Sequence, residues 1–136
     1  MKAVLSRAER LAAKTGHVFI ATADAKGWPH LAAARRLDIT RDGHARLTEW
    51  FCPGTVANLQ VNPRLAIVVW DATTDAGYQI IGELESIKDV GVLDGYSPRE
   101  EKRHPVPQIE RQLLVHIDRV VDFTRAPHTD VVEKGR

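Results

Sequence analysis

The residues best suited to chemistry lie where a strand-like segment gives way to a short predicted helix, at Pro53, Gly54 and Thr55. Proline and glycine at this point indicate a helix entrance, and we expect the Thr55 side chain to cap the first free backbone N–H groups. A helix that opens just after a strand presents unpaired N–H groups and the positive end of its dipole, which together favour an anion such as a phosphate. Most threonine-capped helices bind nothing, so the pattern by itself also fits a purely structural role.

Two aromatic residues, Trp50 and Phe51, come directly before this entrance and offer a surface for a planar ligand. Neighbouring side chains on a strand point to opposite faces, so we expect one ring in the core and the other beside the ligand. The thiol of Cys52 would be reactive at a helix N-terminus, whereas a buried cysteine would be inert, and the sequence leaves both alternatives open.

The histidines show no metal-binding spacing. None of the six forms an i, i+4 pair, and none lies near Cys52 in a ligand-like arrangement. We therefore expect no metal site. No residue resembles a dedicated catalytic acid, base or nucleophile, so the catalytic residues stay unknown at this point.

Bulk composition indicates one globular domain spanning residues 1–136. The hydrophobic fraction of 43% allows a core, and 19 basic against 18 acidic residues give a net charge of +1, which offers no reason to expect a nucleic acid or an anionic membrane as partner. A single cysteine fits a reducing compartment, and no apolar run approaches the roughly 20 residues needed to span a bilayer. We expect a cytoplasmic protein.

Hydrophobic periodicity predicts a mainly β protein with a helix at its N-terminus. The uninterrupted apolar run at residues 65–70 favours a strand covered on both faces, and residues 89–104 read as a loop-rich helical insertion because glycines and prolines interrupt them. The predicted segments are a helix at 2–14, strands at 17–23, 29–40, 44–50, 65–70, 78–87 and 113–123, and a polar tail at 125–136. Short turns between six strands favour an antiparallel barrel or sandwich.

Three motifs in order resemble the pyridoxamine 5′-phosphate oxidase-like, FMN-binding split-barrel superfamily, especially its small single-domain members. They read VFIATADAKGWPH, GTVANLQVNPRLAIVVWD and GYQIIGELESI. The resemblance covers residues 17–123, the expected core barrel, and implies a six-stranded antiparallel split β-barrel, a homodimer, and flavin held across the subunit interface. It implies an FMN-binding flavoprotein that is an oxidoreductase or an electron-transfer protein, with a small-molecule substrate or electron donor. The alternatives are a deazaflavin- or FAD-dependent reductase, and a cofactor-free dimer that binds a small ligand or a partner.

The resemblance also implies which residues surround the cofactor. The second strand and the strand before the helix would border the ring system, and the helix entrance would hold the phosphate. Threonine stands at position 55 where the family commonly has lysine, so Arg35 or Arg36 would supply the missing charge, with only one of the two pointing inward if both lie on a strand. The residues implied are Ala33, Ala34, Arg35, Arg36, Thr48, Glu49, Trp50, Phe51, Gly54, Thr55 and Asn58.

Overall fold

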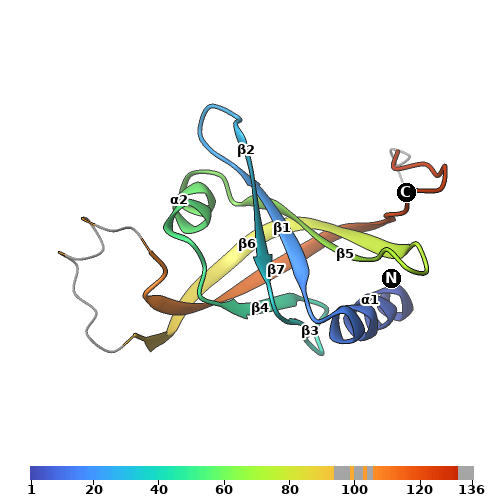
Figure 1. Ribbon diagram of the computed structural model, residues 1–136, viewed down its shortest axis with the longest axis horizontal. Coiled ribbons are helices and arrows are strands. Elements are labelled where there is room, and N and C mark those ends of the chain that lie inside the picture. Colours follow the sequence, from blue (N-terminus) through green and yellow to red (C-terminus); the bar gives the residue numbers. More distant parts are fainter. Residues whose placement is uncertain (94–98, 100–102, 104–105, 132–136) are drawn as a thin grey trace.

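The computed structural model describes residues 1–93, 99, 103 and 106–131, and it shows one strongly twisted sheet with two helices packed against it (Figure 1). The elements are α1 (Lys2–Thr15), β1 (Val18–Ala23), β2 (Pro29–Ala34), β3 (Leu37–Ile39), β4 (Ala45–Glu49), α2 (Pro53–Val61), β5 (Arg64–Asp71), β6 (Ala76–Val92) and β7 (Ile109–Asp122). As expected, Gly16 ends the first helix: its φ of 79° is left-handed, and its N–H donates to the Ala12 carbonyl at 2.8 Å.

The strands form a single antiparallel sheet in the order β2-β1-β5-β6-β7-β4-β3. A mainly β, antiparallel fold with few helices is thus confirmed, and it is the split-barrel arrangement that the sequence predicted. The sheet has seven strands rather than six, because the predicted strand at 29–40 is interrupted at Arg35 and Arg36 and becomes β2 and β3.

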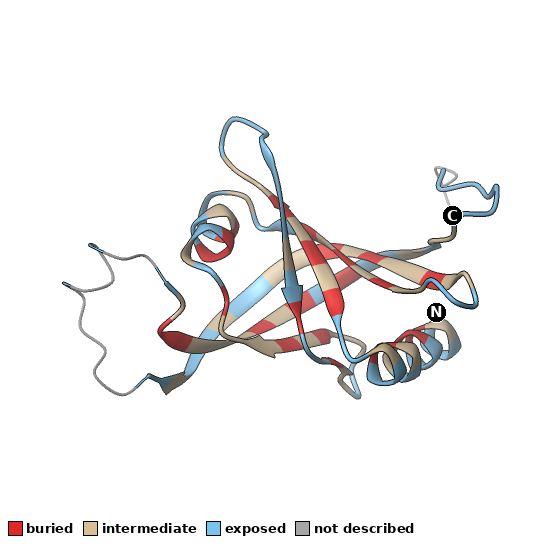
Figure 2. Ribbon diagram, in the orientation of Figure 1, coloured by how far each residue is buried: buried red, intermediate tan, exposed pale blue. Residues whose placement is uncertain are grey.

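The core lies on the concave face of the sheet, where buried side chains from distant strands meet (Figure 2). The largest fully buried side chains include Ile20, Leu47, Ile67 and Leu113. The helix α1 closes one end by burying its apolar stripe against the sheet, and the contacts of this helix are mainly with β5 and β3.

Two predictions about strands were wrong. The strand β5 is buried on one face only, with residues alternating between buried and half-buried, so its unbroken apolar run does not reflect cover on both faces. In addition, residues 89–92 belong to β6 rather than to a helical insertion, because pairing with β7 and the 3.3 Å ion pair between Arg111 and Asp89 extend the ribbon past Gly91. Of the rest of that segment, residues 94–98, 100–102 and 104–105 lie outside the described residues.

Candidate functional site

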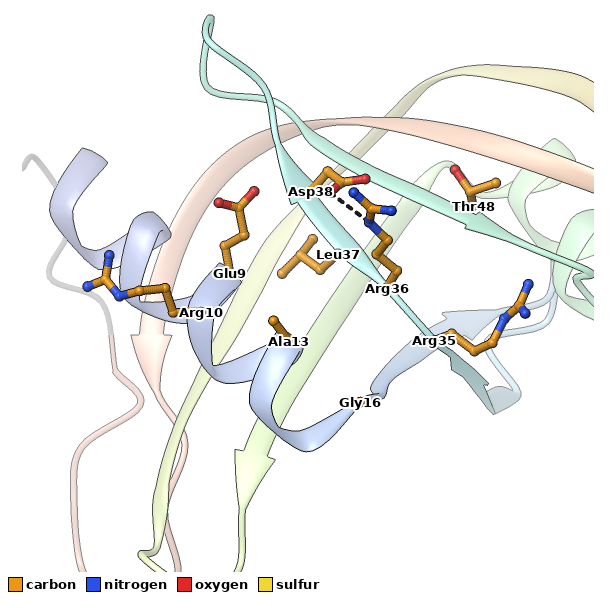
Figure 3. Close-up of a pocket in the computed structure, with 9 residues that line it drawn as sticks. All are labelled: Glu9, Arg10, Ala13, Gly16, Arg35, Arg36, Leu37, Asp38 and Thr48. Atoms are coloured by element: carbon orange, nitrogen blue, oxygen red, sulfur yellow. Dashed lines mark hydrogen bonds and ion pairs between the residues drawn. The ribbon is translucent and has the colours of Figure 1, made fainter.

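A cavity of about 920 Å³ lies between α1, β4 and the point where β2 gives way to β3 (Figure 3). This volume is within the range of small-molecule and cofactor sites. Its lining mixes arginines, carboxylates and small apolar residues, namely Glu9, Arg10, Ala13, Gly16, Arg35, Arg36, Leu37, Asp38 and Thr48. The cavity is therefore a candidate small-molecule site.

Arg35 and Arg36 both line this cavity, which corrects the expectation that only one of them points inward. The expectation assumed a continuous strand, in which neighbouring side chains alternate. The structure instead leaves both residues between β2 and β3, outside regular strand geometry. Strand alternation therefore does not apply to them, and both residues contribute to the lining of the cavity.

Glu49 holds Arg35 in place. One oxygen of its carboxylate, Oε2, accepts hydrogen bonds from both the backbone N–H and the Nε of Arg35, each at 3.0 Å. The other oxygen, Oε1, accepts the backbone N–H of Trp50 at 2.9 Å. A second carboxylate, that of Glu110, lies 3.8 Å from the terminal Nη2 of Arg35, which is too far for a hydrogen bond. The terminal nitrogens of this arginine thus keep unused donors.

The neighbouring Arg36 is also held by a carboxylate through its Nε. Its Nε donates to Asp38 Oδ1 at 3.0 Å, and Asp38 also lies 4.0 Å from the Nε of Arg46 (Figure 3). Across the cavity, the Glu9 carboxylate accepts the backbone N–H of Ile39 at 2.6 Å and so ties α1 to β3. The wall of the cavity is therefore fixed by charge-assisted hydrogen bonds on two sides.

The entrance of α2 differs from the prediction. The helix begins at Pro53 with Cys52 as its N-cap and has no side-chain cap, so Thr55 already lies in the first turn and does not cap it. The Thr55 side chain is fully buried, and its hydroxyl has no hydrogen-bond partner. Proline at the first helical position explains the shift, because its fixed φ suits a helix start and it has no N–H to cap. Gly54 is exposed at this entrance.

The remaining predicted site residues are distributed as follows. Phe51 is 2% exposed and lies in the core, while Trp50 is half-buried, which confirms that one of the two aromatic residues serves the core. Ala34 is buried and Ala33 exposed, and the Asn58 amide donates to the Thr22 hydroxyl at 3.1 Å, which fastens α2 to β1.

Sequence reasoning missed the part of the site that α1 supplies. Glu9, Arg10, Ala13 and Gly16 reach the cavity because α1 folds back across β3, a long-range contact that no local pattern reports. The contact of Asp38 with Arg36 could have been predicted from the sequence, since residues two apart on an extended chain share one face.

The described residues hold no group of three or more histidine, cysteine or acidic side chains arranged to bind a metal. Nor does any described helix have the length and apolar character that crossing a membrane requires. The cysteine Cys52 is exposed, which corrects the alternative of a buried, inert thiol.

Comparison with known proteins agrees with the fold and the motifs. The family model for pyridoxamine 5′-phosphate oxidase matches residues 6–120, so the chain belongs to that family. Comparison with curated protein sequences finds no significant match.

Several solved structures share the fold. An FMN-binding protein from Syntrophomonas wolfei is 16% identical with a TM-score of 0.63, and the match covers 89% of this chain and 86% of that one. A structure described as an F420 reductase is 18% identical with a TM-score of 0.59, covering 83% and 94% of the two chains. The heme storage protein HutZ from Vibrio cholerae is 15% identical with a TM-score of 0.52, covering 87% and 93%. At these identities the likeness shows the fold alone, and the three descriptions name three different bound groups.

Proposed function

We propose that the protein is an FMN-binding flavoprotein that acts as an oxidoreductase or electron carrier, with the flavin in the cavity beside Arg35 and Arg36. The single observation that carries the proposal is that both arginines line one cavity of about 920 Å³ in a chain of the pyridoxamine 5′-phosphate oxidase family. A similar structure is described as FMN-binding, which supports the choice of cofactor.

The donor set of the cavity fits a flavin phosphate. Each arginine uses its Nε for a carboxylate and keeps terminal N–H groups, which match the oxygens of a phosphate in a two-pronged geometry. The arginines thus take over the role that the resemblance gives to a lysine at position 55, where the buried Thr55 cannot act without moving. The Thr48 hydroxyl and the apolar side chains of Ala13 and Leu37 offer the less polar surface that a ring system needs.

A bound flavin would supply the hydride or single-electron transfer itself. The chain positions the ring and sets the local charge. Glu49 accepts hydrogen bonds from Arg35 and from the Trp50 backbone, and it thereby fixes the orientation of the Arg35 guanidinium beside the cavity.

We also propose a homodimer that forms through the outer face of β1, β2 and β5. Phe19, Ala33 and Val68 lie side by side there, since Phe19 is the register partner of Ala33 on β2 and of Val68 on β5. The side chain of Leu31, on the same face of β2, is 64% exposed. An apolar sheet face of this kind is typical of a subunit interface.

Absorption spectroscopy and light scattering of the purified protein test the flavin and the homodimer. We expect a yellow protein whose visible absorption disappears with dithionite, and we expect light scattering to show a dimer. Extraction and chromatography of the bound group separate FMN from the alternatives, FAD or a deazaflavin. A colourless protein that binds none of the three would favour the cofactor-free dimer instead.

A further inference from the structure

A small apolar groove lies on the outer face of the sheet, at the end where β5 and β7 finish. Its volume is about 210 Å³, and none of its lining residues belongs to the cavity proposed for the flavin. The lining consists of Phe19, Val68, Trp70, Phe123, Thr124 and Arg125. An apolar cavity of about 150 Å³ is enough to hold benzene, whereas cofactor sites begin at roughly 300 Å³. The groove therefore suits a ligand built on a single aromatic ring.

The walls of the groove are held in fixed positions by Asp75. Its Oδ1 accepts the indole N–H of Trp70 at 3.0 Å and the backbone N–H of Arg125 at 2.7 Å, and its Oδ2 accepts the backbone N–H of Ala126 at 3.0 Å. The rings of Trp70 and Phe123 meet edge to face, with their centroids 6.1 Å apart. An aromatic ligand therefore meets a preformed surface, which lowers the ordering cost of binding.

Arg125 is the charged residue of this lining. Its guanidinium lies over the indole of Trp70, with Cζ 5.9 Å from the ring centroid. Asp75 Oδ1 is 3.9 Å from the Nε of Arg125, which is too far for a hydrogen bond, and no other described residue accepts one from this guanidinium. The Thr124 hydroxyl, by contrast, already has two polar partners at 3.0 Å. The groove thus offers a ligand aromatic walls and the free N–H donors of one cation.

A second copy of the chain is a poorer occupant of the groove than a small anion. Phe19 and Val68 also belong to the face proposed for the homodimer, so the groove adjoins that face. A subunit docked through the same face would bring uncharged side chains such as those of Leu31 and Ala33, and it would leave the guanidinium without an anion. Charge complementarity therefore favours a small anionic ligand.

We propose that this groove binds a small aromatic carboxylate, with its ring against Trp70 and Phe123 and its carboxylate on Arg125. The planar fork of a guanidinium matches the two oxygens of a carboxylate, and this match makes arginine the suitable cation. The site is independent of the flavin, because the groove and the cavity share no lining residue.

An NMR titration of isotope-labelled protein with phenylacetate, neutral phenylacetamide and acetate tests the inference. The chain has three tryptophans, and the indole N–H signal of Trp70, assigned with Trp70→Phe, should shift with phenylacetate. The signals of Trp28 and Trp50, which lie outside the lining, should not shift. Arg125→Gln should lower the affinity for phenylacetate roughly tenfold and leave that for phenylacetamide unchanged, because only charge-assisted hydrogen bonds are lost. Arg125→Lys should recover part of the loss.

Arg41→Gln is the matched control, since Arg41 is exposed on the turn before β4 and has no ion-pair partner among the described residues. It should bind phenylacetate like the wild type, and Arg125→Gln should bind FMN like the wild type. The absence of a shift at Trp70, acetate binding as tight as that of phenylacetate, or an equal loss in Arg41→Gln would overturn the proposal. An affinity for phenylacetate that falls as the protein concentration rises would also overturn it, since a second copy would then occupy the groove.

Discussion

Arg35 and Glu49 are joined at two points, because the backbone N–H and the Nε of Arg35 both donate to Glu49 Oε2 at 3.0 Å. The pair connects the end of β2 to the end of β4 and thereby fixes one wall of the cavity. The Glu49 carboxylate also partly neutralises the Arg35 guanidinium, which is the positive charge that a flavin phosphate would contact.

Removing that negative charge should therefore tighten FMN binding. In Glu49→Gln the guanidinium of Arg35 keeps only the more distant Glu110 as a counter-charge, and we expect FMN affinity to rise about threefold while riboflavin, which has no phosphate, is unaffected. Titration of both ligands measures the change. Glu83→Gln is the matched control, since it breaks the exposed Arg64–Glu83 pair at 3.3 Å, outside the cavity lining. An equal gain for riboflavin would contradict an electrostatic origin.

The two adjacent aromatic residues should respond differently to alanine. Phe51 is 2% exposed in the core, so Phe51→Ala should lower the free energy of unfolding by about 3–5 kcal/mol. Trp50 is half-buried and lies outside the cavity lining, so Trp50→Ala should cost clearly less stability and leave flavin affinity unchanged. Urea unfolding and flavin titration of both variants decide the matter. The assignment fails if the two variants lose the same stability, or if Trp50→Ala weakens flavin binding.

We expect Thr55 to affect stability rather than phosphate binding, although the sequence had suggested it as a phosphate contact. Its hydroxyl is buried without a partner, so Thr55→Val removes an unsatisfied polar atom and should raise the free energy of unfolding by about 1 kcal/mol. FMN affinity should not change. Chemical denaturation together with FMN titration checks both statements. Weaker FMN binding in this variant would restore Thr55 as a phosphate contact.

A second anchored carboxylate, that of Asp75, predicts how stability depends on pH. Hydrogen bonds from the backbone N–H of Arg125, the indole of Trp70 and the backbone N–H of Ala126 lower the pKa of Asp75 below its ordinary value of 3.8. A lowered pKa means that the stabilisation is fully present above pH 3.8 and is lost as the pH falls through the folded-state pKa.

Asp75→Asn should therefore destabilise the protein at neutral pH, and the difference from the wild type should shrink as the pH falls below 3.8. Thermal unfolding across this range, followed by tryptophan fluorescence, measures the difference. A difference that does not depend on pH would show that the Asp75 charge is not what anchors residues 124–126.

Local patterns predicted the architecture well because alternation, turns and the Gly16 stop are encoded within a few residues. They failed where a long-range contact decides the outcome. At the interruption, Arg35 is bound by Glu49, which lies 14 residues further along the chain, and the extension of β6 past Gly91 depends on pairing with β7. The α1 wall of the cavity could not be predicted either, since Glu9 reaches the Ile39 backbone across 30 residues of chain.

The central claim is that arginines at the interruption between β2 and β3 hold the phosphate of a flavin in the cavity. Parallel titrations of FMN and riboflavin into the wild type and into Arg35→Gln/Arg36→Gln test it most directly. We expect the wild type to bind FMN more tightly than riboflavin, and the double variant to bind the two equally, because only the phosphate contacts are lost. Equal affinity for FMN and riboflavin in the wild type, or an FMN preference that survives in the double variant, would contradict the claim.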